Sequence, residues 1–538
     1  MFPGCCGKSG GRSRTAADRR GSGGESRSVD EGGFSEDDLR QIREEGLAEA
    51  EVRRQWETFR RGVRPLTLDR PCRLGDGIET VDAGEITSLT ALHDAARDAG
   101  RITVFIPASG SATRMFQDWL RVLEEGDFTS PDAGDTFARE LPEYAFYPDL
   151  QAVLERRGTD VETLLRERGY VAILEAILTS GGLNYGRLPK ALLKFHAGTE
   201  GGRTALEEHL VEAALYAGGA EGVCRVHFTV SEEHLPAVQD HLRTIQPRCE
   251  ARLGLRFQVT LSTQNPATDT LAVDLEDRPF RTAGGRLVFR PAGHGALLGN
   301  LQATGGDLVF IKNIDNIVPD RLKVRIVPYK KLLGGVLLSL QREIFRFQRR
   351  LAAGDVGAGE REEMIRFCRD RLHVSLPADF PSRSPMDQAV FLQSRFARPL
   401  RVCGVVPNAG EPGGGPFWVR GNDGVMSLQI VEAFQVDSAS EAQQARWAEA
   451  THFNPVDLVC GLRDERGRMY DLDRFVDRQG GCITLKSEAG RPLKALELPG
   501  LWNGAMAHWN TVFVEVPLET FNPVKTVTDL LRPQHRPG

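Results

Sequence analysis

The sequence has no CxxC pair, and no apolar run in it is long enough to cross a membrane. Its nine cysteines are scattered, which fits a reducing compartment and argues against a disulfide framework or a zinc site. The apolar stretch "LLGGVLLSL" at 332–340 falls far short of the roughly 18 residues that a membrane span needs. We therefore expect a cytoplasmic protein with no membrane partner.

The sequence also has no long basic run, and neither sign of charge dominates it. Its 68 Lys and Arg residues against 74 Asp and Glu residues give a formal net charge of -6. An extended nucleic-acid groove is therefore not expected, although local sites for small anions remain possible. With 538 residues, of which 41% are hydrophobic, the chain can bury a large core and exceeds one ordinary domain.

Two common nucleotide-binding motifs, GxxxxGKS/T and GxGxxG, are absent. A different turn occurs in "RITVFIPASGSATRM", where the apolar segment 102–106 leads into small residues and a helix can begin at Ala112. Ser109 and Gly110 are small enough for the backbone to approach a phosphate, and the amides of a helix N-terminus favour anions. The pattern predicts a phosphate-binding loop, with an ordinary tight turn as the alternative.

Short apolar runs alternate with helical patterns through the middle of the chain. Alternation of this kind predicts an α/β domain with a mostly parallel central sheet. The predicted strands include 224–230, 256–261, 286–290 and 307–311. Before this domain, residues 1–33 lack an apolar h-region and are rich in Gly, Ser and Arg, so they are predicted to be disordered, and 34–100 is predicted to be a helical segment with Ser35 as an N-cap.

Polar side chains stand where predicted strands end. In open parallel sheets, ligands bind outside the carboxyl ends of the strands. Asn313 and Asp315 follow the strand in "LVFIKNIDNIVPD", and His294 stands between two glycines in "PAGHGALL". Asp315 offers the hard oxygen ligand that Mg²⁺ prefers. The alternatives are an Asx-type turn that closes the strand and a structural histidine.

Several blocks of the sequence, taken in order, resemble a known family. They are "PASGSATRM", "LPKALLKFH", "FQVTLSTQNP", "PAGHGALL", "FIKNIDN", "SLQIVEAFQV", "FNPVDL" and "FNPVKTVTDLL". In this order they resemble the eukaryotic-type UTP:glucose-1-phosphate uridylyltransferases and, more distantly, the UDP-N-acetylhexosamine pyrophosphorylases. The chain is also similar to a bacterial family defined by a domain of unknown function.

The resemblance implies the nucleotide-diphospho-sugar transferase fold, which is GT-A-like and Rossmann-like, with a central mixed sheet flanked by helices. It places this domain at 101–531, with helical insertions at about 116–180 and 345–398 and a short tail at 532–538. The implied reaction joins a nucleoside triphosphate, UTP in the first place, to a sugar 1-phosphate with Mg²⁺ and releases pyrophosphate. The oligomeric state is not implied.

The resemblance also implies roles for nucleotide-binding residues. Ser109 and Gly110 fall in the nucleotide-binding loop. Gln264 corresponds to a glutamine near the base, and Gly293 lies against the base.

The remaining implied roles concern the sugar and the phosphates. His294, Asn313 and Asn454 correspond to residues that bind the sugar or its phosphate, and Asp315 to the residue that holds Mg²⁺. Lys190, Lys525 and Arg114 neutralise the phosphates, and Lys525 corresponds to the lysine regarded as catalytic. Each lysine could instead be an ordinary solvated surface residue.

Two differences from the family pattern keep other functions open. Ser109, Ser111 and Ala112 stand where the family loop has glycines, and Pro189 lies far beyond Arg114 in the sequence. A catalytically silent sensor of sugar nucleotides is one alternative, because such a protein would keep the pocket without the transfer. A scaffold protein whose helical insertions bind partners is the other.

Overall fold

The computed structural model describes residues 33–110, 112–198, 201–354, 356–410, 413–421 and 424–536. The predicted disordered segment 1–33 lies outside the described residues, apart from Gly33. None of the helices in the described part of the chain combines the length and the apolar character that a membrane span requires.

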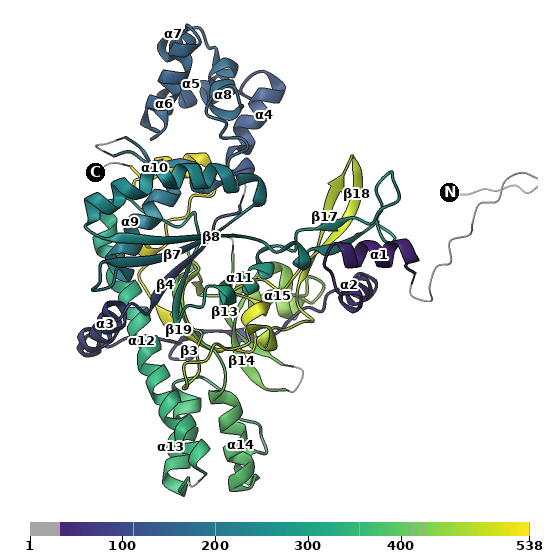
Figure 1. Ribbon diagram of the computed structural model, residues 1–538, viewed down its shortest axis with the longest axis vertical. Coiled ribbons are helices and arrows are strands. Elements are labelled where there is room, and N and C mark those ends of the chain that lie inside the picture. Colours follow the sequence, from purple (N-terminus) through teal and green to yellow (C-terminus); the bar gives the residue numbers. More distant parts are fainter. Residues whose placement is uncertain are drawn as a thin grey trace, which may run out of the picture.

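A ten-stranded mixed sheet forms the centre of the molecule (Figure 1). Its strands, in spatial order, are β2 (Arg73–Leu74), β3 (Gly77–Glu79), β19 (Asn510–Glu515), β12 (Leu400–Pro407), β16 (Asp457–Gly461), β11 (Leu308–Lys312), β4 (Ile102–Pro107), β7 (Val223–Val230) and β8 (Arg256–Thr263). The tenth strand, β15 (His452–Phe453), pairs with the end of β12. β16 runs antiparallel to both of its neighbours, whereas the other pairs along this path are parallel. The predicted α/β class, with a central mixed sheet flanked by helices, is confirmed.

The central strands are apolar because both faces of the sheet are buried. Successive side chains of β11 alternate between two cores, with Phe310 in one and Val309 and Ile311 in the other. Helices α3 (Ala83–Asp98), α9 (Ala205–Ala217) and α12 (Asp320–Ala353) pack on one face of the sheet, and α10 (Leu235–Leu253) packs on α9. The short helix α11 (Leu298–Ala303) belongs to the core on the other face.

Three smaller sheets surround the central one. They are the three-stranded β1 (Thr67–Pro71), β13 (Gly415–Arg420) and β14 (Met426–Val431); the four-stranded β10 (Phe289–Arg290), β9 (Thr270–Val273), β18 (Arg491–Glu497) and β17 (Cys482–Glu488); and the pair β5 (Lys194–His196) and β6 (Arg203–Thr204). Helix α15 (Glu441–Ala448) packs against β1.

The N-terminal part of the chain contains more than helices. Helices α1 (Glu36–Glu44) and α2 (Glu49–Arg61) share a core with the four-stranded sheet, and Ser35 caps α1 as predicted by accepting from the amide of Asp38. β2 and β3 join the edge of the central sheet beside β19. The predicted helical segment 34–100 therefore also supplies strands.

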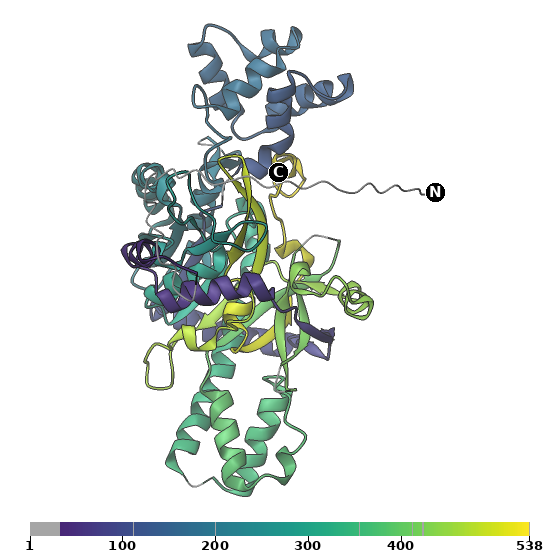
Figure 2. The same cartoon turned by 90° about the vertical axis from the view of Figure 1, so that its right-hand side faces the viewer.

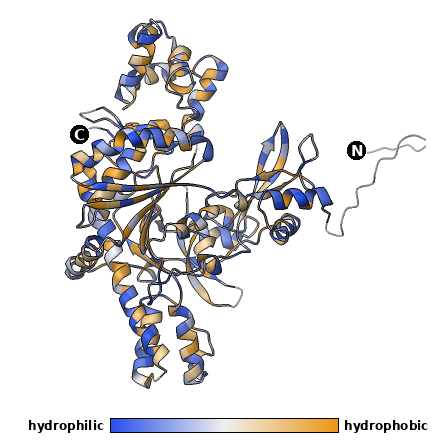
Figure 3. Ribbon diagram, viewed as in Figure 1, coloured by the Kyte–Doolittle hydropathy of each residue, from blue (hydrophilic) through white to orange (hydrophobic). Residues whose placement is uncertain are grey.

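Two groups of helices project from opposite ends of the molecule (Figures 1 and 2). One group consists of α4 (Gln117–Glu125), α5 (Pro131–Glu140), α6 (Tyr147–Arg156), α7 (Val161–Arg166) and α8 (Tyr170–Leu178). The other combines the end of α12 with α13 (Ala358–Asp370) and α14 (Pro385–Phe396). Hydropathy alternates around these helices, whereas the central strands are largely hydrophobic (Figure 3). The domain boundaries given above remain predictions.

Candidate functional site

The carboxyl end of β11 is surrounded by segments from distant parts of the chain. β4 runs parallel to β11, and β16 runs antiparallel to it with Asp457 opposite Lys312. The ends of β4 and β11 and the start of β16 therefore meet at one edge of the sheet. This is the edge at which ligands bind in open α/β sheets.

A carboxylate held by two lysines lies at this edge. Asp315 Oδ2 accepts from Lys190 Nζ at 3.1 Å and from Lys525 Nζ at 3.0 Å. The three residues belong to the separate sequence blocks "LPK", "NIDN" and "NPVKT". The structure thus brings together three of the residues that the sequence predicted to act on phosphates. We call them the Asp315 cluster.

Charge and burial shape the Asp315 cluster. Asp315 is 8% exposed, and burial by itself would raise the pKa of its carboxyl, but the ammonium groups of Lys190 and Lys525 outweigh burial and hold the pKa below its usual value. Burial lowers the pKa of Lys190, and the charge of Asp315 opposes this shift. The Lys525 side chain is 48% exposed, so it can reach a bound ligand. Asp315 Oδ1 is buried and has no hydrogen-bond partner in the described part of the structure.

Backbone contacts clamp the turn after β11 to the C-terminal segment. The amide of Val524 donates to the carbonyl of Asp315 at 3.0 Å, and Lys190 Nζ donates to the carbonyl of Val524 at 2.7 Å. Asn316 Nδ2 donates to the carbonyl of Thr520, and Asn316 Oδ1 accepts from the amide of Asn522. Asn316 therefore has a structural role in the turn after β11, because it fixes the segment that carries Lys525.

The predicted phosphate loop lies next to Lys190. The amide of Lys190 donates to the carbonyl of Gly110 at 3.3 Å, and the amide of Ala112 donates to the carbonyl of Leu188 at 3.2 Å. The structure therefore places Ser109 and Gly110 beside the "LPK" segment, although the two blocks are far apart in the sequence. Arg114 lies in the 3₁₀ turn Thr113–Phe116 and is exposed.

The glycines around His294 are required by close contacts. Gly293 has a φ of +75°, and a Cβ at Gly295 would lie 2.2 Å from the carbonyl oxygen of Pro499. His294 Nδ1 accepts from the amide of Leu501 at 3.0 Å, and its ring stacks on Trp502 with 4.2 Å between ring centroids. Burial lowers the pKa of His294 to about 4. The imidazole is therefore neutral near pH 7, with Nε2–H as its remaining donor.

A substitution at Gly295 tests this packing. We expect Gly295→Ala to lower the free energy of unfolding by about 1–3 kcal/mol, because the added Cβ collides with backbone atoms that cannot rotate away. Gly299→Ala, inside α11 with open space at its Cβ position, is the matched control, and we expect it to be neutral or slightly stabilising. Urea unfolding of both variants measures the difference. Equal effects would show that the close approach at Gly295 is unimportant.

One residue that the sequence analysis missed is Glu432. It follows β14 and is half-buried; burial raises its pKa, while Trp502, Asn503 and Lys525 oppose this shift. Glu432 is therefore near both the His294–Trp502 stack and the Asp315 cluster. Like Asp315, it is an acidic residue close after the end of an apolar strand, in the block "SLQIVEAFQV". The same pattern could have identified it.

Three other predicted residues form no side-chain hydrogen bond or ion pair with the Asp315 cluster within the described part of the chain. Gln264 Nε2 donates to Asp269 Oδ1 at 3.2 Å, next to the end of β8. Asn454 is buried, and its side chain donates to the carbonyl of Gly404 and accepts from the amide of Val456. Asn313 is half-buried at the start of the turn. The Asn454 side chain is thus occupied by backbone groups.

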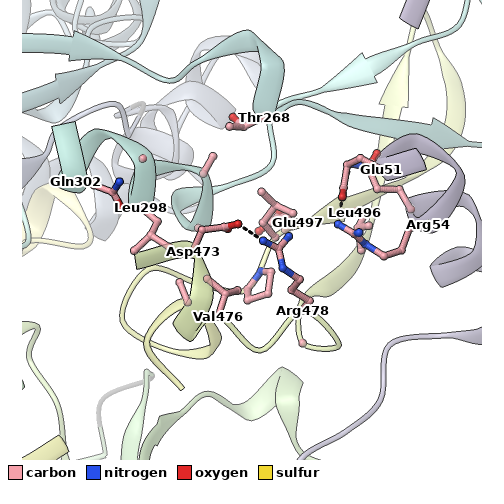
Figure 4. Close-up of a pocket in the computed structure, with 18 of the residues that line it drawn as sticks. Glu51, Arg54, Thr268, Leu298, Gln302, Asp473, Val476, Arg478, Leu496 and Glu497 are labelled. Carbon is pink, nitrogen blue, oxygen red and sulfur yellow. Dashed lines mark hydrogen bonds and ion pairs between the residues drawn. The ribbon is translucent and has the colours of Figure 1, made fainter. Parts of the chain in front are cut away.

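A separate cavity of about 610 Å³ lies between α2, α11 and the segment 469–480 (Figure 4). Arg54 pairs with Glu51 on its wall, and Arg478 pairs with Asp473. Four carboxylates line the cavity against two arginines, so it is poorly suited to a polyphosphate. It shares Gly295 with the His294 loop but contains no residue of the Asp315 cluster.

The mixed sheet and the Asp315 cluster define an α/β protein with a charged site outside the carboxyl edge of its central sheet. The family model described as "Domain of unknown function (DUF4301)" matches residues 35–536, and the chain belongs to this family. No curated protein matches the chain.

Solved structures similar to the chain include three sugar-nucleotide enzymes. UDP-glucose phosphorylase from Trypanosoma brucei is 13% identical, with a TM-score of 0.43, 92% of this chain covered and 77% of that chain. The uridine diphosphate N-acetylglucosamine pyrophosphorylase from Trypanosoma brucei is 15% identical, with a TM-score of 0.43 and coverages of 89% and 74%. A UDP-glucose pyrophosphorylase mutant from Leishmania major in complex with UDP-glucose is 13% identical, with a TM-score of 0.41 and coverages of 92% and 77%. These proteins are of the class that the sequence blocks resemble.

Proposed function

We propose that the protein is a nucleotidyltransferase that joins a nucleoside triphosphate, UTP in the first place, to a sugar 1-phosphate and releases pyrophosphate. The observation that carries this proposal is the Asp315 cluster, in which one buried carboxylate is held by Lys190 and Lys525 at the carboxyl edge of the sheet. The family resemblance of the sequence blocks supports the same reaction. We also propose a cytoplasmic location, which the scattered cysteines without a CxxC pair support.

Charge neutralisation is the main chemical need of this reaction. An oxygen of the sugar phosphate attacks the α-phosphorus of the triphosphate, and pyrophosphate leaves. The attacking phosphate is already ionised near pH 7, since its second pKa is about 6. No strong base is therefore needed, and Lys190, Lys525 and Arg114 serve to bring the two anions together and to stabilise the charge on the phosphates.

Asp315 fits the role of a magnesium ligand. Its Oδ1 atom is buried without a partner in the described structure, although a buried carboxylate oxygen normally has one. Among the described residues, no group of three or more His, Cys, Asp or Glu side chains could hold a metal ion. This agrees with Mg²⁺, which often takes one or two protein carboxylates together with substrate phosphates. When bound, Mg²⁺ supplies charge stabilisation at the phosphate oxygens.

The remaining residues are proposed to orient the two substrates. Ser109 and Gly110, beside Lys190, contact the triphosphate, and Gln264 and Gly293 contact the base. His294 and Asn313 contact the sugar phosphate or the sugar, and His294 can do so through Nε2–H, because its Nδ1 is bonded to Leu501.

Asn454 acts on the sugar by a different route in this proposal. Its side chain is committed to the backbone groups of Gly404 and Val456, so it shapes the loop before β16. Glu432 joins the sugar-binding residues as a hydrogen-bond acceptor.

An assay of pyrophosphate release tests this function. Purified protein with Mg²⁺ is screened with four nucleoside triphosphates against a panel of sugar 1-phosphates, and we expect turnover with one preferred pair. Lys525→Ala should lower kcat by about 10²–10³-fold, because a charge that faces the phosphates is lost. Lys494→Ala is the control. It removes a lysine of β18 that pairs with Asp277, and its kcat should stay within about twofold of the wild-type value.

The same assay, combined with a direct titration of nucleotide binding, separates the alternatives. Nucleotide binding without pyrophosphate release would contradict the transferase and favour a sugar-nucleotide sensor. Failure to bind any nucleotide would favour a scaffold protein.

A further inference from the structure

Helix α9 is unusual because it buries several ionisable side chains. Glu207, Glu208, His209 and Glu212 are each at most 5% exposed. Burying such groups is unfavourable unless each has a partner. Glu208 pairs with Lys323 and His196, and Glu212 pairs with Lys312 at 3.2 Å and with Lys330 at 3.5 Å.

The partner of His209 is a backbone carbonyl next to Asp315. His209 Nε2 lies 3.1 Å from the carbonyl oxygen of Ile314. Burial lowers the pKa of His209 to about 4, so the ring is neutral near pH 7. Because a carbonyl oxygen can only accept, the single proton of the neutral ring resides on Nε2.

This hydrogen bond holds a peptide that the sheet does not hold. β11 ends at Lys312, so the carbonyl of Ile314 lies beyond the ladder of backbone hydrogen bonds. The carbonyl of Asp315 is fixed by the amide of Val524, which belongs to the C-terminal segment. With one carbonyl held by α9 and the next held by the C-terminal segment, the backbone of Asp315 has little freedom to rotate. The direction of its carboxylate is set accordingly.

We infer that His209 is a positioning residue, which keeps the carboxylate of Asp315 aimed at the phosphates and the cation of the proposed reaction. This inference rests on the proposed function. Within the described part of the chain, His209 forms no hydrogen bond with Lys190 or Lys525, and it acts through the Ile314–Asp315 peptide.

Two substitutions separate positioning from simple packing. His209→Phe keeps a ring of similar size but removes the donor, and His209→Gln keeps an N–H donor at comparable reach. We expect His209→Phe to lower kcat and the affinity for Mn²⁺, used as a probe for the cation, by about 10–100-fold. KM for the sugar 1-phosphate should change little, and His209→Gln should recover most of the loss. Mn²⁺ binding is measured by electron paramagnetic resonance in the presence of the nucleotide.

A third readout needs no ligand. Hydrogen–deuterium exchange of wild-type protein and both variants reports on the amide of Val524, which is protected by the carbonyl of Asp315. In His209→Phe, exchange in the peptide around Val524 should rise, while peptides of the central strands stay as in the wild type. In His209→Gln it should remain slow.

The outcomes distinguish this inference from the proposed function. If the wild type is active but His209→Phe matches it in kcat, in Mn²⁺ affinity and in exchange, the positioning role is refuted and the function stands. If the wild type shows no turnover and no Mn²⁺ binding, the proposed function fails, and exchange around Val524 still decides whether His209 orders Asp315. If His209→Phe does not fold, His209→Gln decides the question. Because this variant retains the donor, a loss of kcat and of Mn²⁺ affinity by about 10–100-fold in His209→Gln would overturn the inference.

Discussion

Asp315→Asn is expected to reduce pyrophosphate release by about a thousand-fold, which corresponds to about 4 kcal/mol of lost transition-state stabilisation. The amide keeps the size of the carboxylate but loses the charge that would hold a divalent cation. Without Mg²⁺, however, nucleotide binding should be unchanged or tighter, because Lys190 and Lys525 are then released from the carboxylate to bind phosphates. Steady-state kinetics and nucleotide titration in EDTA measure the two effects separately.

The other end of the same strand supplies a control. Asp307 directly precedes β11 and pairs with Arg101 at 2.6 Å on a partly exposed surface. Asp307→Asn removes the same charge from the amino end of the strand and should change kcat by no more than about twofold. A comparable loss in both variants would place the catalytic site elsewhere, and so would an Asp315→Asn variant that retains a tenth of the activity.

The Asp315 cluster could be predicted because its members stand in short local patterns. Asp315 follows an apolar run that is typical of a buried strand, and the carboxyl ends of such strands are where ligands bind. Lys190 and Lys525 stand in blocks that resemble one family in the same order. The inner strands were predictable for the same reason, since β4, β11 and β16 are buried on both faces of the sheet and are mostly apolar.

The contacts that hold the site in place could not be predicted, because they join residues far apart in the sequence. Asn313 and Asn316 look alike in "NIDN", yet Asn316 is committed to the backbone of Thr520 and Asn522. Asn454 stands in a block that suggested contact with a sugar, but its side chain is occupied by backbone groups. No local pattern tells whether an amide side chain points into a cleft or toward its own backbone.

Helix α9 shows that the partners of charged residues could not be predicted from the sequence either. The pattern "GRTALEEHLVEAALYA" is typical of a helix whose acidic side chains face water. In the structure Glu208 and Glu212 are buried, because they pair with lysines of β11 and α12 that lie a hundred or more residues further along the chain. Sequence alone identifies the charges but not their partners.

Lys330→Met is expected to lower the free energy of unfolding by about 3–5 kcal/mol, because the buried carboxylate of Asp457 loses its lysine and Glu212 keeps only Lys312. Lys330 is 1% exposed, donates to Asp457 Oδ2 at 2.7 Å and lies 3.5 Å from Glu212 Oε1. Its neighbour Lys331 is the matched control, since it is partly exposed and pairs with Asp94, and Lys331→Met should change the free energy by no more than about 1 kcal/mol. Urea unfolding at pH 7 measures both.

The cause of the loss can be tested by removing the second charge and by lowering the pH. Asp457→Leu added to Lys330→Met should recover part of the stability, because an apolar pair can replace a buried ion pair. Burial would raise the pKa of Glu212, but Lys312 and Lys330 hold it at about 2, below the ordinary value of 4.5. The stability that Glu212 contributes is therefore present above about pH 4.5 and is lost as the pH falls toward 2. In Lys330→Met this acid loss should begin at a higher pH, and an unchanged acid profile would show that Lys330 does not hold the charge of Glu212.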